Sequence, residues 1–477
     1  MALKINRKKF LQLSILAPLS LMTKPMRIFS LQPNKLTSPT ADAIPVIYYK
    51  PGDADYDILR KGFNKRIDKK PAIIALCNNT QGVADAINFA AKNNLPVAIK
   101  SGGHCMEGFS VNNGGMVINL SAMKKIEWID TETVKVNPAC TLQEIYDALL
   151  PKNKIIPGGS CAGVGIGGLV LGGGYGLLAR KFGLTCDSLQ AITMVDGTGK
   201  IQTASAGSEL LWACKGGNNG NFGVVTALTF KVHQAPPTMQ SFRFKSYKQT
   251  TDQVKKTMNQ WFTLTAKLPD NCFSAFVQNG KTTYILLTNV GPNNDSIQKT
   301  IDGLKAVTQK FTQTQKAPLS QALKVFYGQK NPLYFKNASA GLYKNFAQIE
   351  SYIDQVLNIT LNTPGMIYQV NTLGGKIQSP EFEKQSAFPH RAYPFFSELQ
   401  TYWESPSQQQ NLLIQFQKVQ DIFNKNGTTA QYRNYPDLNF NGFADLYYGN
   451  SLKKLQQIKN KYDPKNLFRY EQSLKNS

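Results

Sequence analysis

The chain has 477 residues, of which 42% are hydrophobic, so it is long enough to bury more than one core and is expected to hold two domains. Lys and Arg number 54 against 30 Asp and Glu, which gives a formal net charge of +24. The basic residues are dispersed and form no arginine-rich run interleaved with aromatics. The composition therefore argues against a nucleic-acid-binding protein and favours a solubilising, anion-attracting surface.

Residues 1–31 have the pattern of a targeting segment. Four basic residues near the start precede an apolar stretch, 10–22, that is too short to span a bilayer and fits the core of a signal peptide. Residues 6–12 are also similar to a twin-arginine signal, with Lys8 in place of the second arginine. We therefore expect export to the periplasm or out of the cell, with no stable membrane span.

The first half of the chain predicts small mixed α and β units. Apolar residues recur at helical spacing over 83–91, and a buried strand predicted over 95–99 leads directly into the glycine loop 100–104. A further strand is predicted over 133–136. The sequence at 141–144 is a capping box that opens the next helix.

Turn residues mark the later elements. Residues 196–199 read D-G-T-G and separate two strand-like stretches, which predicts a hairpin. Two prolines at 236–237 break the pattern and mark a domain boundary. Beyond them an amphipathic helix is expected over 254–268, and a second hairpin over 273–284 with its turn at Asn279-Gly280.

Two nucleophilic side chains each end a glycine-rich motif. His104 ends K-S-G-G-H at 100–104, and Cys161 ends P-G-G-S-C at 157–161. Glycine lets the backbone approach a ligand closely, and a nucleophile held in such a loop is one way to attach a cofactor covalently. The seven cysteines have no CxxC spacing and only three histidines are present, so neither a metal site nor a disulfide is predicted.

A third glycine run follows Cys161. Gly163, Gly165 and Gly168 satisfy the GxGxxG pattern, with Asp187 at a suitable distance beyond. A Rossmann site is nonetheless excluded, because no strand precedes these glycines and the three glycines at 172–174 would break the required helix. The run is better interpreted as backbone whose N–H groups line a cofactor.

The order of these motifs resembles a known family. The chain reads A-G-V-G-I-G-G-L-V-L-G-G-G-Y-G at 162–176, then L-T-C-D-S-L at 184–189 and G-N-F-G-V-V-T at 220–226. This series resembles the FAD-linked oxidoreductases of the vanillyl-alcohol oxidase type, which carry a PCMH-type FAD-binding domain, and among them the berberine-bridge-enzyme-like branch. The resemblance covers about 71–233 and resumes at 432–468.

The resemblance implies an α+β fold with a two-part FAD-binding domain. It assigns an FAD-binding domain to 45–235, a substrate domain to 236–428, and a C-terminal segment, 429–477, that returns to the FAD-binding domain. The substrate domain is expected to be an antiparallel sheet covered by helices.

The resemblance also implies a bicovalent FAD. His104 is similar to the family's histidine bonded to the 8α methyl carbon of the flavin, and Cys161 to the cysteine bonded to ring carbon 6. Two tethers leave an open pocket that suits bulky substrates. The other residues implied to contact the cofactor are Ser101, Gly102, Gly103, Cys105, Gly165, Gly168, Gly172, Gly173, Tyr175, Gly176, Asp187, Asn221, Gly223, Val225, Tyr432 and Asn434.

Catalytic roles follow from the same resemblance. Tyr435 matches a tyrosine that faces the flavin and is the candidate base, which requires neighbours that lower its pKa from about 10. Val164 falls where the family places a residue beside the oxygen-reactive face, and valine there resembles members that use oxygen. Asn371 stands where some members carry a carboxylate, three residues before Gly374. An acidic helper is therefore not expected there, and Gln369 or Asn371 is expected to contact substrate.

The preferred hypothesis is an exported FAD oxidase of a sugar or oligosaccharide hydroxyl, with hydride transfer to flavin N5 and O2 reduced to hydrogen peroxide. The alternative keeps the fold and cofactor but acts on a phenolic, polyketide or alkaloid-like small molecule, as an oxidase or a dehydrogenase. A third hypothesis is a basic binding protein without catalysis, which the presence of His104, Cys161 and Tyr435 argues against. The expected partners are a small-molecule substrate and O2.

Overall fold

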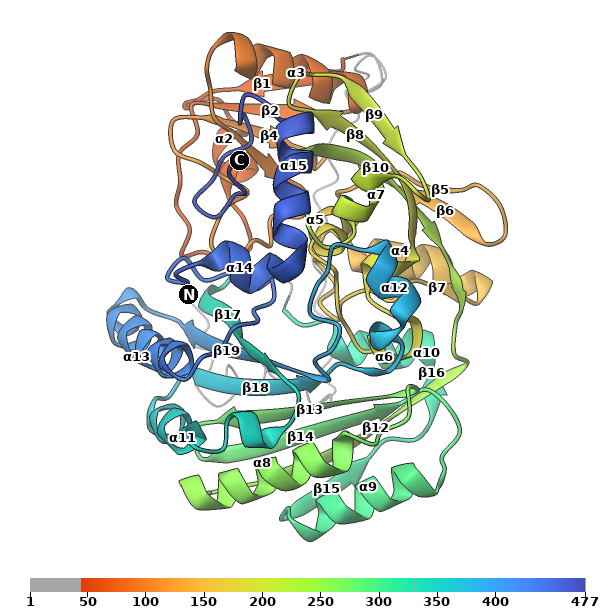
Figure 1. Cartoon of the computed structure of the whole chain (residues 1–477), viewed down its shortest axis with the longest axis vertical. Helices are drawn as coiled ribbons and strands as arrows, with labels where there is room; N and C mark the ends of the chain where they lie inside the picture. Colours follow the sequence, from red (N-terminus) through yellow and green to blue (C-terminus); the bar gives the residue numbers. More distant parts are fainter. Residues whose placement is uncertain (1–43, 330, 477) are drawn as a thin grey trace, which may run out of the picture.

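The computed structural model describes residues 44–329 and 331–476. The targeting segment expected at 1–31 lies outside these ranges. The described chain has the α+β fold that the sequence predicted. Figure 1 shows a large sheet with helices along its outer side in the lower half of the molecule, and smaller sheets above it. None of the helices in the described ranges is long and apolar enough to cross a membrane.

A four-stranded sheet leads to the His104 loop. Its strands, in order across the sheet, are β1 (Val46–Tyr49), β2 (Ile73–Cys77), β4 (Met116–Asn119) and β3 (Val97–Lys100). Helix α3 (Thr80–Lys92) connects β2 to β3, and both strands run parallel to β4. The Asn79 side chain caps α3 by accepting from the N–H of Gly82. The helix predicted over 83–91 and the strand predicted over 95–99 are thus confirmed.

The second sheet has five strands. They are, in order, β5 (Ile126–Trp128), β6 (Thr133–Val136), β10 (Gly223–Lys231), β8 (Leu189–Asp196) and β9 (Ile201–Ala204). Strands β8 and β9 form the hairpin predicted around 196–199. Helix α4 (Leu142–Leu149) begins at the predicted capping box, in which the Thr141 hydroxyl accepts from Glu144 N–H and the Glu144 carboxylate accepts from Thr141 N–H.

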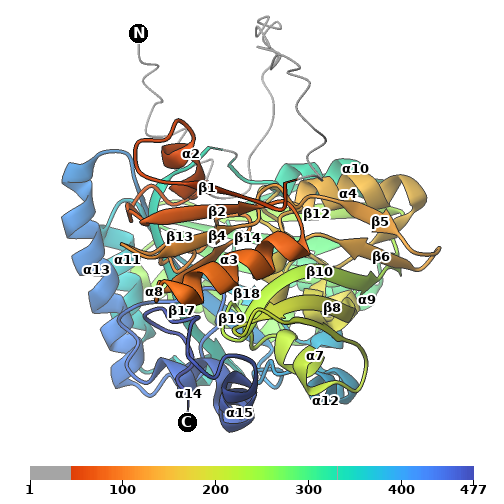
Figure 2. The same ribbon diagram turned by 90° about the horizontal axis from the view of Figure 1, so that it is seen from above.

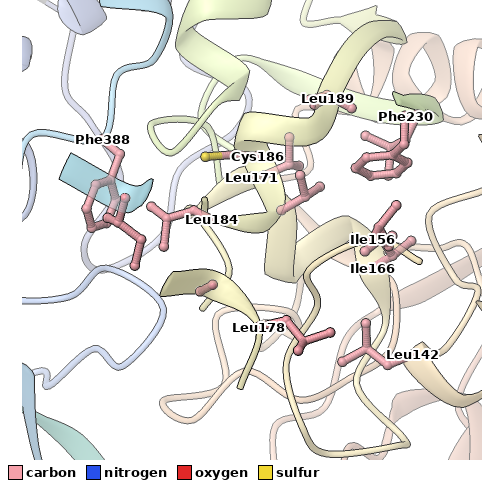
Figure 3. Close-up of a cluster of buried hydrophobic side chains, with 14 of the residues drawn as sticks. Leu142, Ile156, Ile166, Leu171, Leu178, Leu184, Cys186, Leu189, Phe230 and Phe388 are labelled. Atoms are coloured by element: carbon pink, nitrogen blue, oxygen red, sulfur yellow. The ribbon is translucent and has the colours of Figure 1, made fainter. Parts of the chain in front are cut away.

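A hydrophobic core lies beside this second sheet. It is covered by α4 and by two short helices, α5 (Ile166–Leu171) and α6 (Ala179–Phe182). Helix α5 ends directly before the three glycines at 172–174, so this glycine run has no long helix of the Rossmann kind. Figure 3 labels ten of the core side chains: Leu142, Ile156, Ile166, Leu171, Leu178, Leu184, Cys186, Leu189, Phe230 and Phe388.

The third sheet is large and antiparallel. Its strands, in order, are β15 (Lys310–Gln313), β12 (Thr238–Ser246), β14 (Thr282–Asn289), β13 (Cys272–Asn279), β18 (Met366–Thr372), β19 (Phe395–Trp403) and β17 (Tyr334–Tyr343), and β16 (Ala317–Pro318) also pairs with β12. Asn279 pairs with Thr282, and Gly280 has a φ of +51°, which confirms the predicted hairpin turn.

The two faces of the large sheet have different partners. Four helices cover the outer face: α8 (Thr251–Thr265), α9 (Asp295–Ala306), α11 (Ile353–Asn362) and α13 (Pro406–Lys425) (Figure 1). Successive side chains of a strand point to opposite faces. Phe276, Val370 and Leu399 therefore pack in the apolar cluster with these helices, whereas the residues next to them face the smaller sheets.

The C-terminal segment returns to the smaller sheets. Helix α15 (Leu452–Tyr462) packs against α7 (Glu209–Cys214), and α14 (Phe443–Tyr448) packs against α15 (Figure 2). The N–H of Gly197, in the β8–β9 turn, donates to the carbonyl of Tyr462 at 2.8 Å. Other short elements are α2 (Tyr56–Arg60), β7 (Lys154–Ile155), β11 (His233–Gln234), α10 (Leu319–Ala322) and α12 (Pro380–Gln385).

Candidate active site

A cavity of about 520 Å³ lies between the smaller sheets and the inner face of the large sheet. Its walls come from the loop after β3, the glycine run around α5, the strands β13, β17, β18 and β19, and the segment 433–436. These segments are far apart in the sequence and meet only in the folded chain. The volume is within the range of about 300–1,000 Å³ that is usual for cofactor and ligand sites.

The two glycine loops meet backbone to backbone at this cavity. A side chain on Gly165 would place its Cβ 2.6 Å from the Gly102 nitrogen, which is closer than Cβ atoms come to other heavy atoms. Only glycine therefore lets the two loops approach each other. As a result, His104 and Cys161 line the same cavity.

His104 is held as a neutral imidazole. Its ring stacks on Phe63, with the centroids 4.4 Å apart and the planes 14° from parallel. Burial lowers the pKa of His104 to about 4, so the ring is uncharged at neutral pH. A neutral imidazole keeps a lone pair on one ring nitrogen, and this lone pair is what a covalent bond to a cofactor requires.

Cys161 is the exposed member of the seven cysteines, all of which are described and free, and it opens onto the cavity. Desolvation by the surrounding protein raises the pKa of its thiol, and the Glu398 carboxylate raises it further. The thiol is thus protonated at neutral pH, and Glu398 is near enough to influence it.

The cavity brings together most of the residues that the sequence predicted. Those that line it are Ser101, Gly102, Gly103, His104, Cys105, Cys161, Val164, Gly165, Gly168, Tyr175, Gly176, Gly223, Val225, Gln369, Asn371, Asn434 and Tyr435. The structure places the other five outside the lining, and these are Gly172, Gly173, Asp187, Asn221 and Tyr432.

Three of these five lie directly behind the lining. A Cβ on Gly172 would collide with the amide oxygen of Asn434, so this glycine leaves room for that side chain. The Tyr432 hydroxyl accepts from the N–H of Gly174 and from Asn434 Nδ2, both at 3.0 Å. Gly173 has a φ of +113°, a conformation that favours glycine. The three residues therefore position Asn434 and the loop that carries it.

Asp187 and Asn221 contact other protein residues and do not line the cavity. Asp187 forms a buried ion pair with Arg391, with 2.6 Å between Oδ1 and Nη2. Asn221 Nδ2 donates to the Tyr448 hydroxyl, and the Tyr470 hydroxyl donates to Asn221 Oδ1, each at 3.1 Å. Both residues stabilise segments around the site.

Glu398 on β19 is a functional candidate that the sequence analysis missed. It lines the cavity, is 5% exposed, and burial raises its pKa to about 7. Asn371 Nδ2 donates to Glu398 Oε1 at 3.2 Å. Strand β18 carries Asn371 where some family members have a carboxylate, and the neighbouring strand β19 supplies a carboxylate, Glu398, in its place. The available signal was the alternation of polar residues along β19, where Glu398, Gln400 and Tyr402 occupy every second position.

Tyr435 lines the cavity beside Phe396, with their ring centroids 5.4 Å apart. A role as base requires neighbours that lower the pKa of Tyr435, and the surroundings of this tyrosine do the opposite. Burial raises its pKa well above the ordinary value, and the negative charge of Glu398 raises it further. The hydroxyl is therefore a stable proton donor, and Glu398 is the stronger candidate for the base.

A chain of hydrogen bonds crosses the inner face of the large sheet and ends on Glu398. Each group donates to the next, from Asn337 to Tyr402 (2.9 Å), Gln400 (3.0 Å), Gln369 (3.3 Å), Asn371 (2.8 Å) and Glu398 (3.2 Å). At the start of the chain, Asn337 Oδ1 is buried and has no hydrogen-bond partner among the described residues. This acceptor is therefore left unsatisfied by the described protein groups.

A buried ion cluster fixes three walls of the cavity relative to one another. The Lys336 ammonium on β17 contacts Glu107, in the loop after β3, at 3.0 Å, and Asp437, in the C-terminal segment, at 2.8 Å. Arg66 contacts the other oxygen of Glu107 at 2.9 Å. Removing one member would leave a buried charge unpaired, so we regard the cluster as structural.

The residues present fit FAD. Within the described ranges, the backbone N–H groups of 102–105 donate to no acceptor, and consecutive free N–H groups of this kind bind phosphate. A Cβ on Gly168 would meet nothing within 4 Å, so the space beside this glycine is open. His104 and Cys161 both line this cavity and carry nucleophilic groups that could hold a flavin covalently. Fold and site therefore define the class of protein as an FAD-dependent oxidoreductase.

Comparison with known proteins agrees with this assignment. Residues 71–205 match the FAD binding domain family, and residues 431–475 match the family described as berberine and berberine like. The uncharacterized FAD-linked oxidoreductase YgaK of Bacillus subtilis is 31% identical over 437 residues, which are 88% of this chain and 95% of YgaK. The chain therefore belongs to the FAD-linked oxidoreductases, in their berberine-bridge-enzyme-like branch, and the resemblance inferred from the sequence is confirmed.

Two further proteins extend the comparison. The chitooligosaccharide oxidase of Gibberella zeae is 28% identical over 451 residues, covering 87% of this chain and 89% of that protein. A crystal structure of aclacinomycin oxidoreductase has the same fold, with a TM-score of 0.82 at 24% identity over 91% of this chain and 100% of that chain.

Proposed function

We propose that the enzyme is an oxidase of a sugar or oligosaccharide hydroxyl, that it holds FAD covalently through His104 and Cys161, and that it passes the electrons to O2 to give hydrogen peroxide. The observation that carries this proposal is the hydrogen-bond chain that crosses the large sheet and ends on Glu398. The relative from Gibberella zeae, which is named for an oligosaccharide, supports it.

The lining of the large sheet suits a substrate with many hydroxyl groups. Asn337, Gln400 and Gln369 present amide donors and acceptors along one wall of the cavity. Asn337, which carries the unpaired Oδ1, stands at the end of this wall. Amides that hydrogen-bond to one another keep further donor and acceptor capacity for substrate hydroxyls, so this wall suits a polyhydroxylated substrate better than an apolar one.

The protein groups divide the reaction between them. A bound FAD supplies hydride acceptance and reoxidation by O2. Glu398, with a pKa of about 7, accepts the proton of the substrate hydroxyl as the carbonyl forms. The side chains of Asn371 and Gln400 both hydrogen-bond to the Glu398 carboxylate, with Asn371 Nδ2 3.2 Å from Oε1, and so orient it in the cavity wall. The Tyr435 hydroxyl, which stays protonated, donates a hydrogen bond to the reacting oxygen.

The residue at position 164 supports O2 as the electron acceptor of the reduced flavin. Val164 lines the cavity three residues after Cys161, and its N–H donates to the Cys161 carbonyl at 3.3 Å. Its compact side chain leaves room for O2 beside the proposed attachment point.

Residues 1–31 carry the signal-like sequence that supports export. Fractionation of the producing cells tests this expectation.

The alternative substrate is a phenolic, polyketide or alkaloid-like molecule, oxidised with O2 or with another acceptor. The observation that favours it is the apolar wall formed by Phe273, Ala275 and Val277 on β13 and by Leu286 on β14. Aclacinomycin oxidoreductase, whose name gives a different kind of substrate from chitooligosaccharide oxidase, has the same fold.

Peroxide release separates the two substrate classes. We expect the purified enzyme to release peroxide with members of an oligosaccharide panel and not with a panel of aromatic and alicyclic alcohols at equal concentrations. Peroxide release with the aromatic panel alone would establish the alternative.

Asn337→Ala is expected to raise KM for the active sugar more than it lowers kcat. Asn337 stands at the end of the hydrogen-bond chain opposite Glu398, so its side chain is expected to contribute to substrate binding rather than to proton transfer.

Covalent attachment predicts where the flavin goes after acid precipitation. The flavin of the unmodified protein is expected to stay with the pellet, and it should do so in His104→Ala and in Cys161→Ala because each keeps one bond. The double variant is expected to release FAD into the supernatant. Cys105→Ala, which changes a neighbouring thiol in the same cavity, is the control and should keep the flavin bound. Free flavin from the unmodified protein would refute covalent attachment.

A further inference from the structure

Arg433 is a buried cation without an acidic partner in the described chain. It lines the cavity and is 5% exposed. The polar groups that contact it are the neutral hydroxyls of tyrosines, and no described Asp or Glu forms an ion pair with it. By contrast, Arg391 and Lys459 each contact a carboxylate at 2.6 Å. A charge buried without a counter-ion is costly, so the position of Arg433 calls for an anion.

Aromatic residues orient the guanidinium and leave part of it free. Its Nε donates to the Tyr448 hydroxyl at 3.1 Å, and Nη2 donates to the Tyr470 hydroxyl at 2.9 Å. Its carbon lies 5.6 Å from the ring centroid of Phe109 and 5.2 Å from that of Tyr447. The remaining nitrogen, Nη1, donates to none of the described residues. The tyrosine hydroxyls thus satisfy two donor groups but not the charge.

Two aromatic neighbours of Arg433 connect it to the two glycine turns of the cavity. Phe109 continues the loop whose N–H groups at 102–105 are free, and Gly103 in that loop has a φ of +69°. On the other side, the Tyr470 hydroxyl shares its one proton between Asn221 Oδ1 at 3.1 Å and the carbonyl of Asn219 at 3.2 Å, and the residue after Asn219, Gly220, lines the cavity with a φ of +82°. Arg433 therefore lies against Phe109, which follows the first glycine turn, and is linked to the second through Tyr470; such turns are common phosphate sites.

We infer that Arg433 supplies the counter-charge for the diphosphate of the bound FAD, opposite the free N–H groups of 102–105. The flavin ring is uncharged when oxidised, whereas the diphosphate carries the negative charge that a buried guanidinium requires. The inference rests on the FAD site of the proposed function. It adds Arg433 to the FAD-binding residues, although this residue lies in neither of the two glycine-rich loops.

The test compares flavins that differ in phosphate content. In a His104→Ala, Cys161→Ala background the flavin is expected to be removable, so dissociation constants for riboflavin, FMN and FAD can be measured by quenching of flavin fluorescence. Arg433→Gln is expected to weaken FMN and FAD binding by about 10- to 100-fold and to leave riboflavin binding unchanged. Arg60→Gln is the matched control, because Arg60 pairs with carboxylates outside the cavity. It should change none of the three constants.

An equal weakening of all three flavins by Arg433→Gln would overturn the inference and leave Arg433 a packing residue. If this variant does not fold, Arg433→Lys and Tyr470→Phe replace it. The lysine keeps the charge and should retain the preference for FAD over riboflavin, whereas loss of the Tyr470 hydroxyl should reduce that preference. An unchanged preference in Tyr470→Phe would count against the inference. A background that binds none of the flavins before Arg433 is changed would overturn the cofactor site itself, and this inference with it.

Discussion

Replacing Glu398 by glutamine is expected to lower kcat/KM for the alcohol substrate by about 10²- to 10⁴-fold while the flavin content stays the same. Glutamine keeps the shape and the hydrogen bond from Asn371, but it cannot accept the hydroxyl proton. In the unmodified enzyme, kcat/KM is expected to rise with pH up to about 7 and then level off, because the ionised carboxylate is the active form and burial raises its pKa to about 7. The Glu398→Gln enzyme should lose this rise.

Steady-state kinetics from pH 5 to pH 9 measure both effects. Glu404→Gln is the matched control, since Glu404 is an exposed carboxylate at the residue after β19. It is expected to leave both the rate and the pH profile unchanged. A Glu398→Gln enzyme that keeps the rise near pH 7 would show that another group is the base.

Tyr435→Phe is expected to lower kcat/KM by about 10- to 100-fold, through the loss of one hydrogen bond to the reacting oxygen. The rise of kcat/KM near pH 7 is expected to persist in this variant. Burial and Glu398 raise the pKa of Tyr435 well above its usual value, so the phenol does not set a transition near neutrality.

The pH profile of Tyr435→Phe distinguishes a proton donor from a base. If Tyr435 were the base, the variant would lose its pH dependence and would resemble the expected Glu398→Gln enzyme. Tyr247→Phe, which removes the hydroxyl of an exposed tyrosine outside the cavity, serves as control and should behave as the unmodified enzyme.

Local sequence signals predicted the parts of the site that local backbone geometry determines. The His104 and Cys161 loops carry runs of glycine because their backbones approach each other, and Gly102 and Gly165 show this approach directly. The Asn279-Gly280 turn likewise follows from the conformation that a two-residue hairpin requires.

Residues whose roles depend on long-range pairing could not be predicted in this way. Glu398 becomes a site residue because β18 and β19 pair with Gln369 opposite Glu398, and nothing near Glu398 in the sequence encodes that register. Asp187 shows the opposite case, since it lies at a suitable spacing for a nucleotide-binding acid but pairs with Arg391, far along the chain. Spacing within a motif does not reveal a partner that the fold brings from elsewhere.

Anaerobic mixing of the purified flavoprotein with an oligosaccharide, followed by air, tests the central claim most directly. The account predicts that the sugar bleaches the absorbance of oxidised flavin near 450 nm and that readmitted oxygen restores it with one hydrogen peroxide per flavin. Bleaching by apolar alcohols and by none of the oligosaccharides, or a reduced flavin that air does not reoxidise, would contradict the assignment as a sugar oxidase.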